Sequence, residues 1–185
     1  MKKLALSIAL LAAATASFGQ PAQSPADIEM MKQQLLAVQK ARQGEAANLA
    51  NFDDLDFNVY SGQKWKELAR SHSKDIVVHY ADGSVSRGLD AHVEQLKPLF
   101  VFAPDTRIRE HPIKIASGDW TAVQGVVEGT FTKPMPTGDG KSVPPTGKAF
   151  RLTMVTIGHW QGGVMVEEWL MMDNQSFTKQ VRLAP

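Results

Sequence analysis

The sequence of 185 residues contains no cysteine. The chain therefore gains no disulfide bond, even in an oxidising compartment. Lipid attachment through a lipobox is also excluded, because it needs a cysteine directly after the N-terminal apolar run. A metal site built on cysteine pairs is excluded for the same reason.

The chain also lacks an excess of charge of one sign. It has 20 Lys and Arg against 19 Asp and Glu, and removal of Lys2 and Lys3 would leave 18 against 19 (20 minus 2). Binding to phosphate backbones needs a basic excess, so nucleic acid is not an expected partner. No run after the N-terminus is long and apolar enough for a transmembrane helix, so no membrane span is expected.

The first residues have the order of a signal peptide. A basic start, Met1-Lys2-Lys3, precedes an apolar run of about thirteen residues, LALSIALLAAATA, which is too short to span a bilayer. Small residues follow and provide a cleavage site near Ala16 to Gly19. We expect residues 1–19 to be removed and the mature protein to be periplasmic or secreted. A buried N-terminal helix is the alternative.

Residues 20–50 are predicted to form a tether followed by a helix. Ser24 can cap this helix, Pro25 suits its first position, and Asp27 stands where a capping-box carboxylate is found. Apolar residues then recur at spacings of three and four, the pattern of one helical face: Ile28, Met31, Leu35 and Val38. Gly44 is predicted to end the helix.

Residues 51–185 are predicted to form one domain of the α+β class. Two short helical pieces come first, and a helix after residue 88 is disturbed at Pro98. The Pro- and Gly-rich stretch 133–146 predicts a surface loop. Strand-like segments cover 75–80, 107–116, 120–132, 149–160 and 164–173, with a last one near 176–182. This order favours a curved antiparallel sheet with helices packed across it, which would leave a cone-shaped cavity.

The segment 164–173 ends in the first candidate for chemistry, Asp173. Alternate residues of a strand share a face, so Asp173 is expected beside Trp169 and Met171. If that face lines the cavity, burial raises the pKa of Asp173 above about 3.9 and suits it to general acid–base catalysis. The alternative is that Asp173 caps the strand end before a turn at Asn174.

Histidine provides the second candidate. His79, in DIVVHYADG, can partner a buried carboxylate, lie at an exposed edge or pack as a neutral ring. His159 lies beside a turn, and three further histidines stand singly and rank lower: His72, His92 and His111. No His-x-x-x-His helix supports a metal site, and no G-x-G-x-x-G follows a strand. Neither a metal nor another cofactor is expected.

Four stretches resemble a known family when they are taken together in order: GLDAHVEQLKPLFVFAPD, SGDWTAVQGVVEGTFT, PPTGKAF and EEWLMMDNQSFTKQ. They are similar to the SnoaL-like polyketide cyclases, often labelled ester cyclases, of the nuclear-transport-factor-2-like superfamily. The resemblance covers most of Phe52–Leu183. It implies a cone-shaped, cystatin-like α+β barrel and cofactor-independent ring closure of the aldol type, in which an aspartate removes a proton next to a carbonyl.

The resemblance also implies site residues. Asp173 matches the general acid/base through the spacing Trp169-x-x-x-Asp173, and His79 matches a histidine that points toward the cavity. The residues expected to contact a ligand are Trp120, Phe131, Met154, His159, Trp169 and Met171. The expected ligand is a small hydrophobic carbonyl compound, which the protein would cyclise, isomerise or hydrolyse. A non-catalytic binding protein for such a ligand is the alternative, and a homodimer is the expected assembly.

Overall fold

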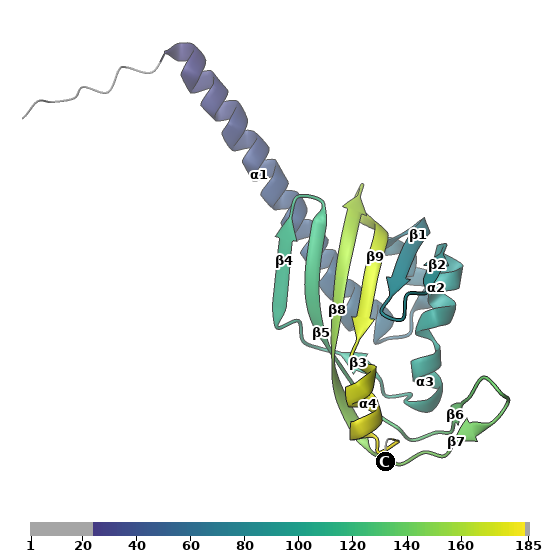
Figure 1. The fold of residues 1–185 in the computed structure, drawn as a ribbon. Coiled ribbons are helices and arrows are strands. Elements are labelled where there is room, and N and C mark those ends of the chain that lie inside the picture. The colour runs from purple at the N-terminus through teal and green to yellow at the C-terminus, as the bar shows by residue number, and fades with distance from the viewer. Residues whose placement is uncertain (1–23, 184–185) are drawn as a thin grey trace, which may run out of the picture. The chain divides into compact units, whose positions relative to one another are not determined.

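The computed structural model describes residues 24–183, so the predicted signal peptide lies outside the described residues (Figure 1). The chain divides into two compact units, 1–36 and 37–185. The first unit, where it is described, contains the beginning of helix α1 (Pro25–Asp54). The second unit contains the rest of α1 and all other elements, and it holds the candidate site.

Helix α1 begins as predicted and ends later than predicted. The Ser24 hydroxyl and the Asp27 carboxylate each accept a backbone N–H of the other residue, at 3.2 and 3.0 Å, which is a capping box. The helix continues through Gly44 to Asp54. A single glycine costs a helix only about 1 kcal/mol, and the alanine- and leucine-containing residues that follow favour helix.

The main sheet has the strand order β2-β1-β9-β8-β5-β3, and β4 pairs with the other part of β5. Its strands are β1 (His72–Tyr80), β2 (Val85–Arg87), β3 (Arg107–Ile108), β4 (Ile113–Ser117), β5 (Trp120–Thr130), β8 (Ala149–Gln161) and β9 (Val164–Met172). The predicted α+β class is confirmed, but the sheet is mixed. Strand β1 runs parallel to β9, a long-range pairing that local patterns do not reveal.

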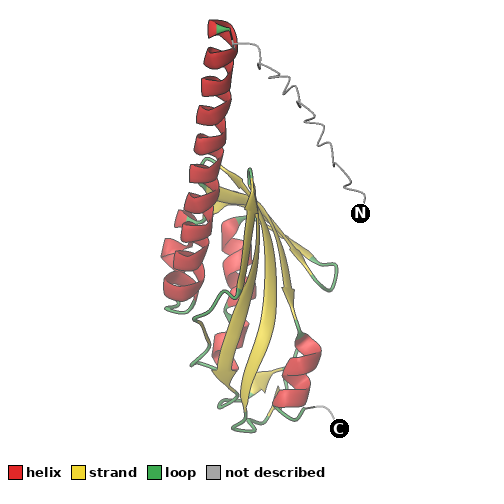
Figure 2. Cartoon of the chain, turned by 90° about the vertical axis from the view of Figure 1, so that its left-hand side faces the viewer, coloured by secondary structure: helices red, strands yellow, loops and turns green. Residues whose placement is uncertain are grey.

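The helices of the second unit lie mainly along one face of the twisted sheet (Figure 2). After α1, the helices on this face are the π-helix η1 (Leu55–Tyr60), the 3-10 helix η2 (Trp65–Arg70), α2 (Leu89–Leu96) and α3 (Pro98–Phe102). The predicted disturbance at Pro98 is confirmed, because α3 begins there. The predicted loop 133–146 contains a short hairpin of β6 (Met135–Pro136) and β7 (Ser142–Val143).

The last predicted strand, near 176–182, is wrong. Residues Asn174–Gln180 form helix α4, with Asp173 as its N-cap. The cap hydrogen bonds satisfy backbone donors that would otherwise be unpaired at the helix start.

Alternation along the central strands decides which face is the core. Residues 121, 123, 125, 127 and 129 of β5 and 150, 152, 154, 156, 158 and 160 of β8 are buried, whereas their neighbours on the other face are mostly more exposed. In β9 the inward side chains are Met165, Glu168, Leu170 and Met172, paired in register with β8. The helices cover this inner face.

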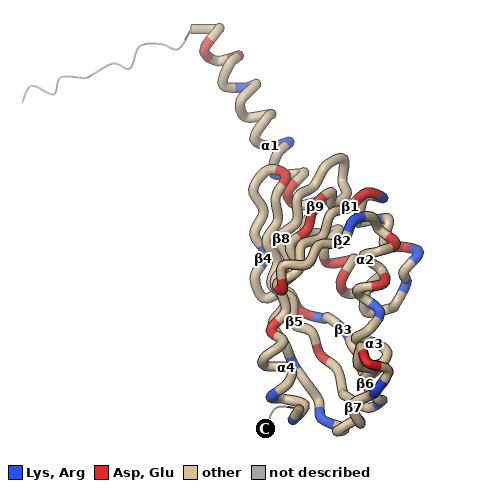
Figure 3. The backbone as a smooth tube through the Cα atoms, turned by 45° about the vertical axis from the view of Figure 1, so that its right-hand side comes forward, with Lys and Arg blue, Asp and Glu red and all other residues tan. Residues whose placement is uncertain are grey.

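The described residues bear on two kinds of partner, a membrane and a polyanion. Within residues 24–183, no helix is both long and apolar enough to cross a membrane. Lys and Arg are interspersed with Asp and Glu along the described chain (Figure 3).

Candidate functional site

The structure places Asp173 at the start of α4, not on an inner wall. Its carboxylate accepts hydrogen bonds from the backbone N–H and the hydroxyl of Ser176, at 2.9 and 2.6 Å, and the side chain is exposed. These hydrogen bonds lower the pKa of Asp173. The expected burial is therefore wrong, and the capping alternative describes the position. An exposed cap lacks the raised pKa that the predicted role requires.

Most of the other predicted site residues lie on the outer face of the sheet. The His79 ring stacks on Trp169 with centroids 4.8 Å apart, and Trp120 stacks on His159 at 4.4 Å. Met171 is also exposed on this face. Their expected place in the cavity is therefore wrong. Both faces of β9 are apolar, so alternation could not identify the inner face, and the structure shows that this is the face that carries Glu168.

The two remaining predicted ligand-binding residues point inward. Phe131 is completely buried in the core and does not line the inner cavity, whereas Met154 does. Met154 is thus the one predicted contact residue that the structure places at the inner cavity.

The inner cavity lies between the sheet and η1, α1 and α2, and has a volume of about 40 Å³. Its apolar walls are Phe52, Leu55, Leu96, Ile108, Met154, Leu170 and Met172, and its polar side chains are Asp56, Tyr60, His72, Thr156 and Glu168. A neighbouring groove of about 270 Å³ shares the lining residues Tyr60, Leu96, Leu170 and Met172. Apolar walls with a few convergent polar groups are typical of small-molecule sites.

Asp56 is the buried carboxyl group of η1. The π-helical turn places both Asp56 and Tyr60 on the cavity side, and turns of this type are frequent at functional sites. The Asp56 carboxylate lies 2.8 Å from His111 Nε2, and His111 Nδ1 lies 2.7 Å from Asp53. Lys114 donates to the other oxygen of Asp53 at 2.7 Å. A relay of carboxylate, imidazole and carboxylate therefore leads from the cavity toward the surface.

The pKa values of Asp56 and His111, the two inner members of this relay, are both raised. Burial raises the pKa of Asp56, and its hydrogen bond to His111 offsets only part of that effect. Burial lowers the pKa of His111, but the hydrogen bonds and charges of Asp56 and Asp53 outweigh it, and the pKa is raised. A carboxyl group of raised pKa in a small cavity has the properties of a general acid or base.

Thr156 provides a hydroxyl group at the same cavity. In the described part of the chain its Oγ1 is buried and has no hydrogen-bond partner, and the residue is 1% exposed. A buried hydroxyl without a partner is costly. A ligand oxygen in the cavity would satisfy it.

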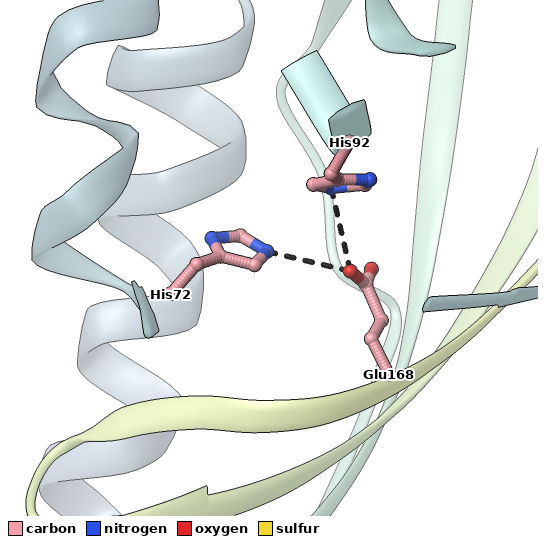
Figure 4. Close-up of side chains that lie close together, drawn as sticks. All are labelled: His72, His92 and Glu168. Atoms are coloured by element: carbon pink, nitrogen blue, oxygen red, sulfur yellow. Dashed lines mark hydrogen bonds and ion pairs between the residues drawn. The ribbon is translucent and has the colours of Figure 1, made fainter. Parts of the chain in front are cut away.

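A second buried cluster joins His72 of β1, His92 of α2 and Glu168 of β9 (Figure 4). The Nε2 atoms of His72 and His92 lie 3.3 and 3.4 Å from the same Glu168 oxygen. Burial lowers the pKa of His92 to about 4. Burial raises the pKa of Glu168, but the two histidines outweigh it and leave it lowered.

Sequence patterns did not point to Asp56, Thr156 or Glu168, and they ranked His72, His92 and His111 low. The available signals were weak: Asp56 stands between Leu55 and Phe57 in an apolar stretch, and Glu168 interrupts an apolar strand. Both are acids where the pattern requires apolar residues, and the structure satisfies each with histidine.

Comparison with known proteins supplies the family. The family model for SnoaL-like polyketide cyclase matches residues 50–181, most of the chain. The chain belongs to this family. The comparison with curated proteins finds no match.

Solved structures of similar fold agree with the family. A protein from Jannaschia sp. CCS1, named a SnoaL-like polyketide cyclase, has a TM-score of 0.65 and 18% identity, over 76% of this chain and 95% of its own. IdmH from Streptomyces antibioticus, named a polyketide cyclase, has 0.61 and 21%, over 75% and 98%. AclR from Streptomyces galilaeus, named a hydroxylase, has 0.61 and 19%, over 78% and 99%. At these identities the SnoaL-like fold is shared, and one fold hosts different chemistries.

Proposed function

We propose that the protein catalyses proton transfer next to the carbonyl group of a small hydrophobic compound bound in the inner cavity. Asp56 is the general acid/base, His111 positions it, and the Thr156 hydroxyl binds the carbonyl oxygen. The supporting observation is a buried carboxyl group of raised pKa that shares an apolar cavity with an unpartnered hydroxyl. Cyclisation or isomerisation would follow from this step.

The proposed step moves one proton between the substrate carbon and Asp56. The Asp56 carboxylate takes a proton from the carbon next to the carbonyl, so a C–H bond breaks and an O–H bond forms. The electron pair moves into a carbon–carbon double bond, and the negative charge develops on the carbonyl oxygen. A donor placed at that oxygen lowers the barrier, as in an oxyanion hole. Return of the proton to a different atom completes an isomerisation.

The cavity volume limits the substrate. About 40 Å³ provides room on the order of three water molecules. This favours a small carbonyl compound over a multi-ring polyketide, with the groove of about 270 Å³ next to it as the way in.

Hydrogen–deuterium exchange tests the proposal without a known substrate. Acetone and hydroxyacetone, which suit the small cavity, are incubated with the protein in D₂O, and loss of the proton signal next to the carbonyl is followed by NMR. We expect exchange above the buffer rate for the wild type. Asp56→Asn should reduce the protein-dependent rate by about 10²–10⁴, the usual contribution of a positioned acid–base group.

Asp173→Asn is the matched control, because it changes the same side chain at an exposed cap. It should exchange like the wild type. Equal exchange by Asp56→Asn and wild type would contradict the proposed role. Binding of the probes by NMR without any exchange would instead favour a non-catalytic binding protein.

We further propose export and self-association. The basic start and the short apolar run support cleavage of residues 1–19 and a periplasmic or secreted location; N-terminal sequencing of the protein from a cell-envelope extract checks this. The apolar outer face of the sheet supports a homodimer.

A further inference from the structure

We propose that His72, His92 and Glu168 form a binding site for a divalent transition metal, with Zn²⁺ as the preferred ion. Figure 4 shows both imidazole rings directed at the same carboxylate oxygen, from β1, α2 and β9. Two histidines and one glutamate are a known ligand set for zinc. The inference goes beyond the proposed function, whose acid–base pair needs no metal, and it departs from the expectation that no metal is bound.

Two of the three ligand–ligand distances fit a metal polyhedron better than hydrogen bonds, and the three ligand atoms all lie within 4.8 Å of one another. For zinc bonds of about 2.0–2.1 Å, neighbouring ligands of a tetrahedron are roughly 3.3–3.4 Å apart. The two nitrogen–oxygen distances are 3.3 and 3.4 Å. Charge-assisted hydrogen bonds are about 2.7–2.9 Å long, and other imidazole–carboxylate pairs of this protein have that length: 2.7 and 2.8 Å at His111, and 2.8 Å at His79.

The partner of His72 Nδ1 orients its other nitrogen for a metal. Nδ1 lies 2.9 Å from Ser71 Oγ, and that hydroxyl donates to the carbonyl of Leu68 at 3.1 Å. With its only hydrogen used, Ser71 Oγ accepts a hydrogen from Nδ1. When the ring is neutral, the lone pair of Nε2 then faces the Glu168 carboxylate, an unfavourable arrangement that a cation between them would reverse.

His92 has a corresponding outer partner. Its Nδ1 lies 3.1 Å from the Tyr80 hydroxyl, which lies 3.1 Å from Ser86 Oγ. Donation from Nδ1 to Tyr80, and from Tyr80 to Ser86, leaves Nε2 of His92 free as a ligand. Metal-binding histidines commonly have such outer partners, which fix ring orientation.

The fourth position would be open to the cavity. The three side chains are at most 5% exposed, and His72 and Glu168 line the inner cavity. Three protein ligands with one position left for water or substrate are typical of catalytic zinc. A bound zinc ion would supply a Lewis acid for an oxygen of a ligand in the cavity.

Metal binding is measured on the full mature chain without a polyhistidine tag. The protein is treated with EDTA, dialysed, and titrated with Zn²⁺ by calorimetry, and the bound zinc is counted by mass spectrometry of the elements. We expect one zinc per chain. Cobalt should replace zinc and give the intense visible bands of a tetrahedral site.

Two variants test the ligands. Glu168→Gln and His92→Gln should each weaken zinc binding by more than the roughly 10–100-fold that loss of an outer partner costs. The matched controls His79→Gln and Glu167→Gln change a histidine–glutamate pair of hydrogen-bond length on the outer face, and they should bind zinc like the wild type. Circular dichroism confirms that each variant is folded.

Two outcomes would overturn the proposal: a wild-type protein that takes up no stoichiometric zinc, or folded ligand variants that bind zinc as well as the controls do. Asp56→Asn should retain zinc binding, because it lies in the other cluster. A wild type that exchanges the probe protons but binds no zinc would overturn the metal site alone. A wild type that binds zinc but exchanges no protons would overturn the proposed function alone.

Discussion

Two aspartates of this protein illustrate how position sets the chemistry of a residue. Asp56 is enclosed by apolar side chains and one histidine, and burial raises its pKa. Asp173 is exposed, accepts two hydrogen bonds from Ser176 and has a lowered pKa. Desolvation disfavours the charged form and hydrogen bonding to the carboxylate favours it. Asp56 is therefore the group suited to exchange a proton.

His111 should make the free energy of unfolding depend on pH. Its pKa is raised above the ordinary 6.5, so the folded state holds this proton more tightly than the unfolded state. The stabilisation is fully present below 6.5 and is lost as pH rises through the folded pKa. His111→Gln should therefore show a smaller fall in the free energy of unfolding above 6.5. Urea denaturation at pH values on both sides of 6.5 measures it; parallel profiles would contradict it.

Sequence patterns predict the role of a single residue only where its partners are close in the chain. Ser24 and Asp27 are three apart in the chain, so their hydrogen bonds follow from local order. Asp56 and His111 meet only after the chain folds. The candidate site consists of such long-range pairs, and no local pattern contains them.

At the scale of elements, the pairing of β5 with β8 depends on close backbone approach. Gly129 of β5 is opposite Phe150 of β8. A Cβ at Gly129 would lie 2.6 Å from Phe150 Cζ and 3.0 Å from Thr106 Oγ1. The core ring would have to move to admit any side chain.

Gly129→Ala should therefore lower the free energy of unfolding by about 1–3 kcal/mol, the usual cost of overpacking. Gly138→Ala is the matched control, because a Cβ there has no neighbour within 4 Å; its effect should stay within about 0.5 kcal/mol. Denaturant unfolding measures both. Equal stability of the two variants would contradict the packing argument.

Elements were predictable where their signal was local. The break at Pro98 and the central strands follow from proline chemistry and alternation. The parallel partner of β1 was not predictable, because a distant strand sets it. The helix after Asp173 was missed although its cap, formed with Ser176, is a local signal. Inner and outer faces of β9 were also indistinguishable, since both are apolar.

At the scale of the whole molecule, the outer face of the sheet exposes several large apolar side chains, among them Ile115, Trp120 and Met171. One cross-strand row runs through Ile115, Ala122, Ile157, Trp169, His79 and Val85. Ile115 is 59% and Trp120 43% exposed. Glu167 on this face is paired with His79 at 2.8 Å. A second copy presents the same apolar face, so two copies can bury it about a two-fold axis.

We expect the wild type to have twice the chain mass in light scattering, and Ile115→Lys to have the mass of one chain. In the proposed dimer, a lysine on this face would be desolvated without a partner. Val101→Lys, at an exposed valine of α3, is the control and should remain a dimer. A monomeric wild type, or an unchanged mass for Ile115→Lys, would rule out this interface.

The central claim is that the proton-transferring carboxyl group is the buried Asp56 and not the exposed Asp173. A pH titration of the ¹³C-labelled aspartate carboxyl groups by NMR tests it most directly, with Asp56→Asn and Asp173→Asn to assign the two signals. Asp56 should titrate above 3.8 and Asp173 below it. An Asp56 signal that titrates at or below 3.8 would rule out Asp56 as the proton-transferring group.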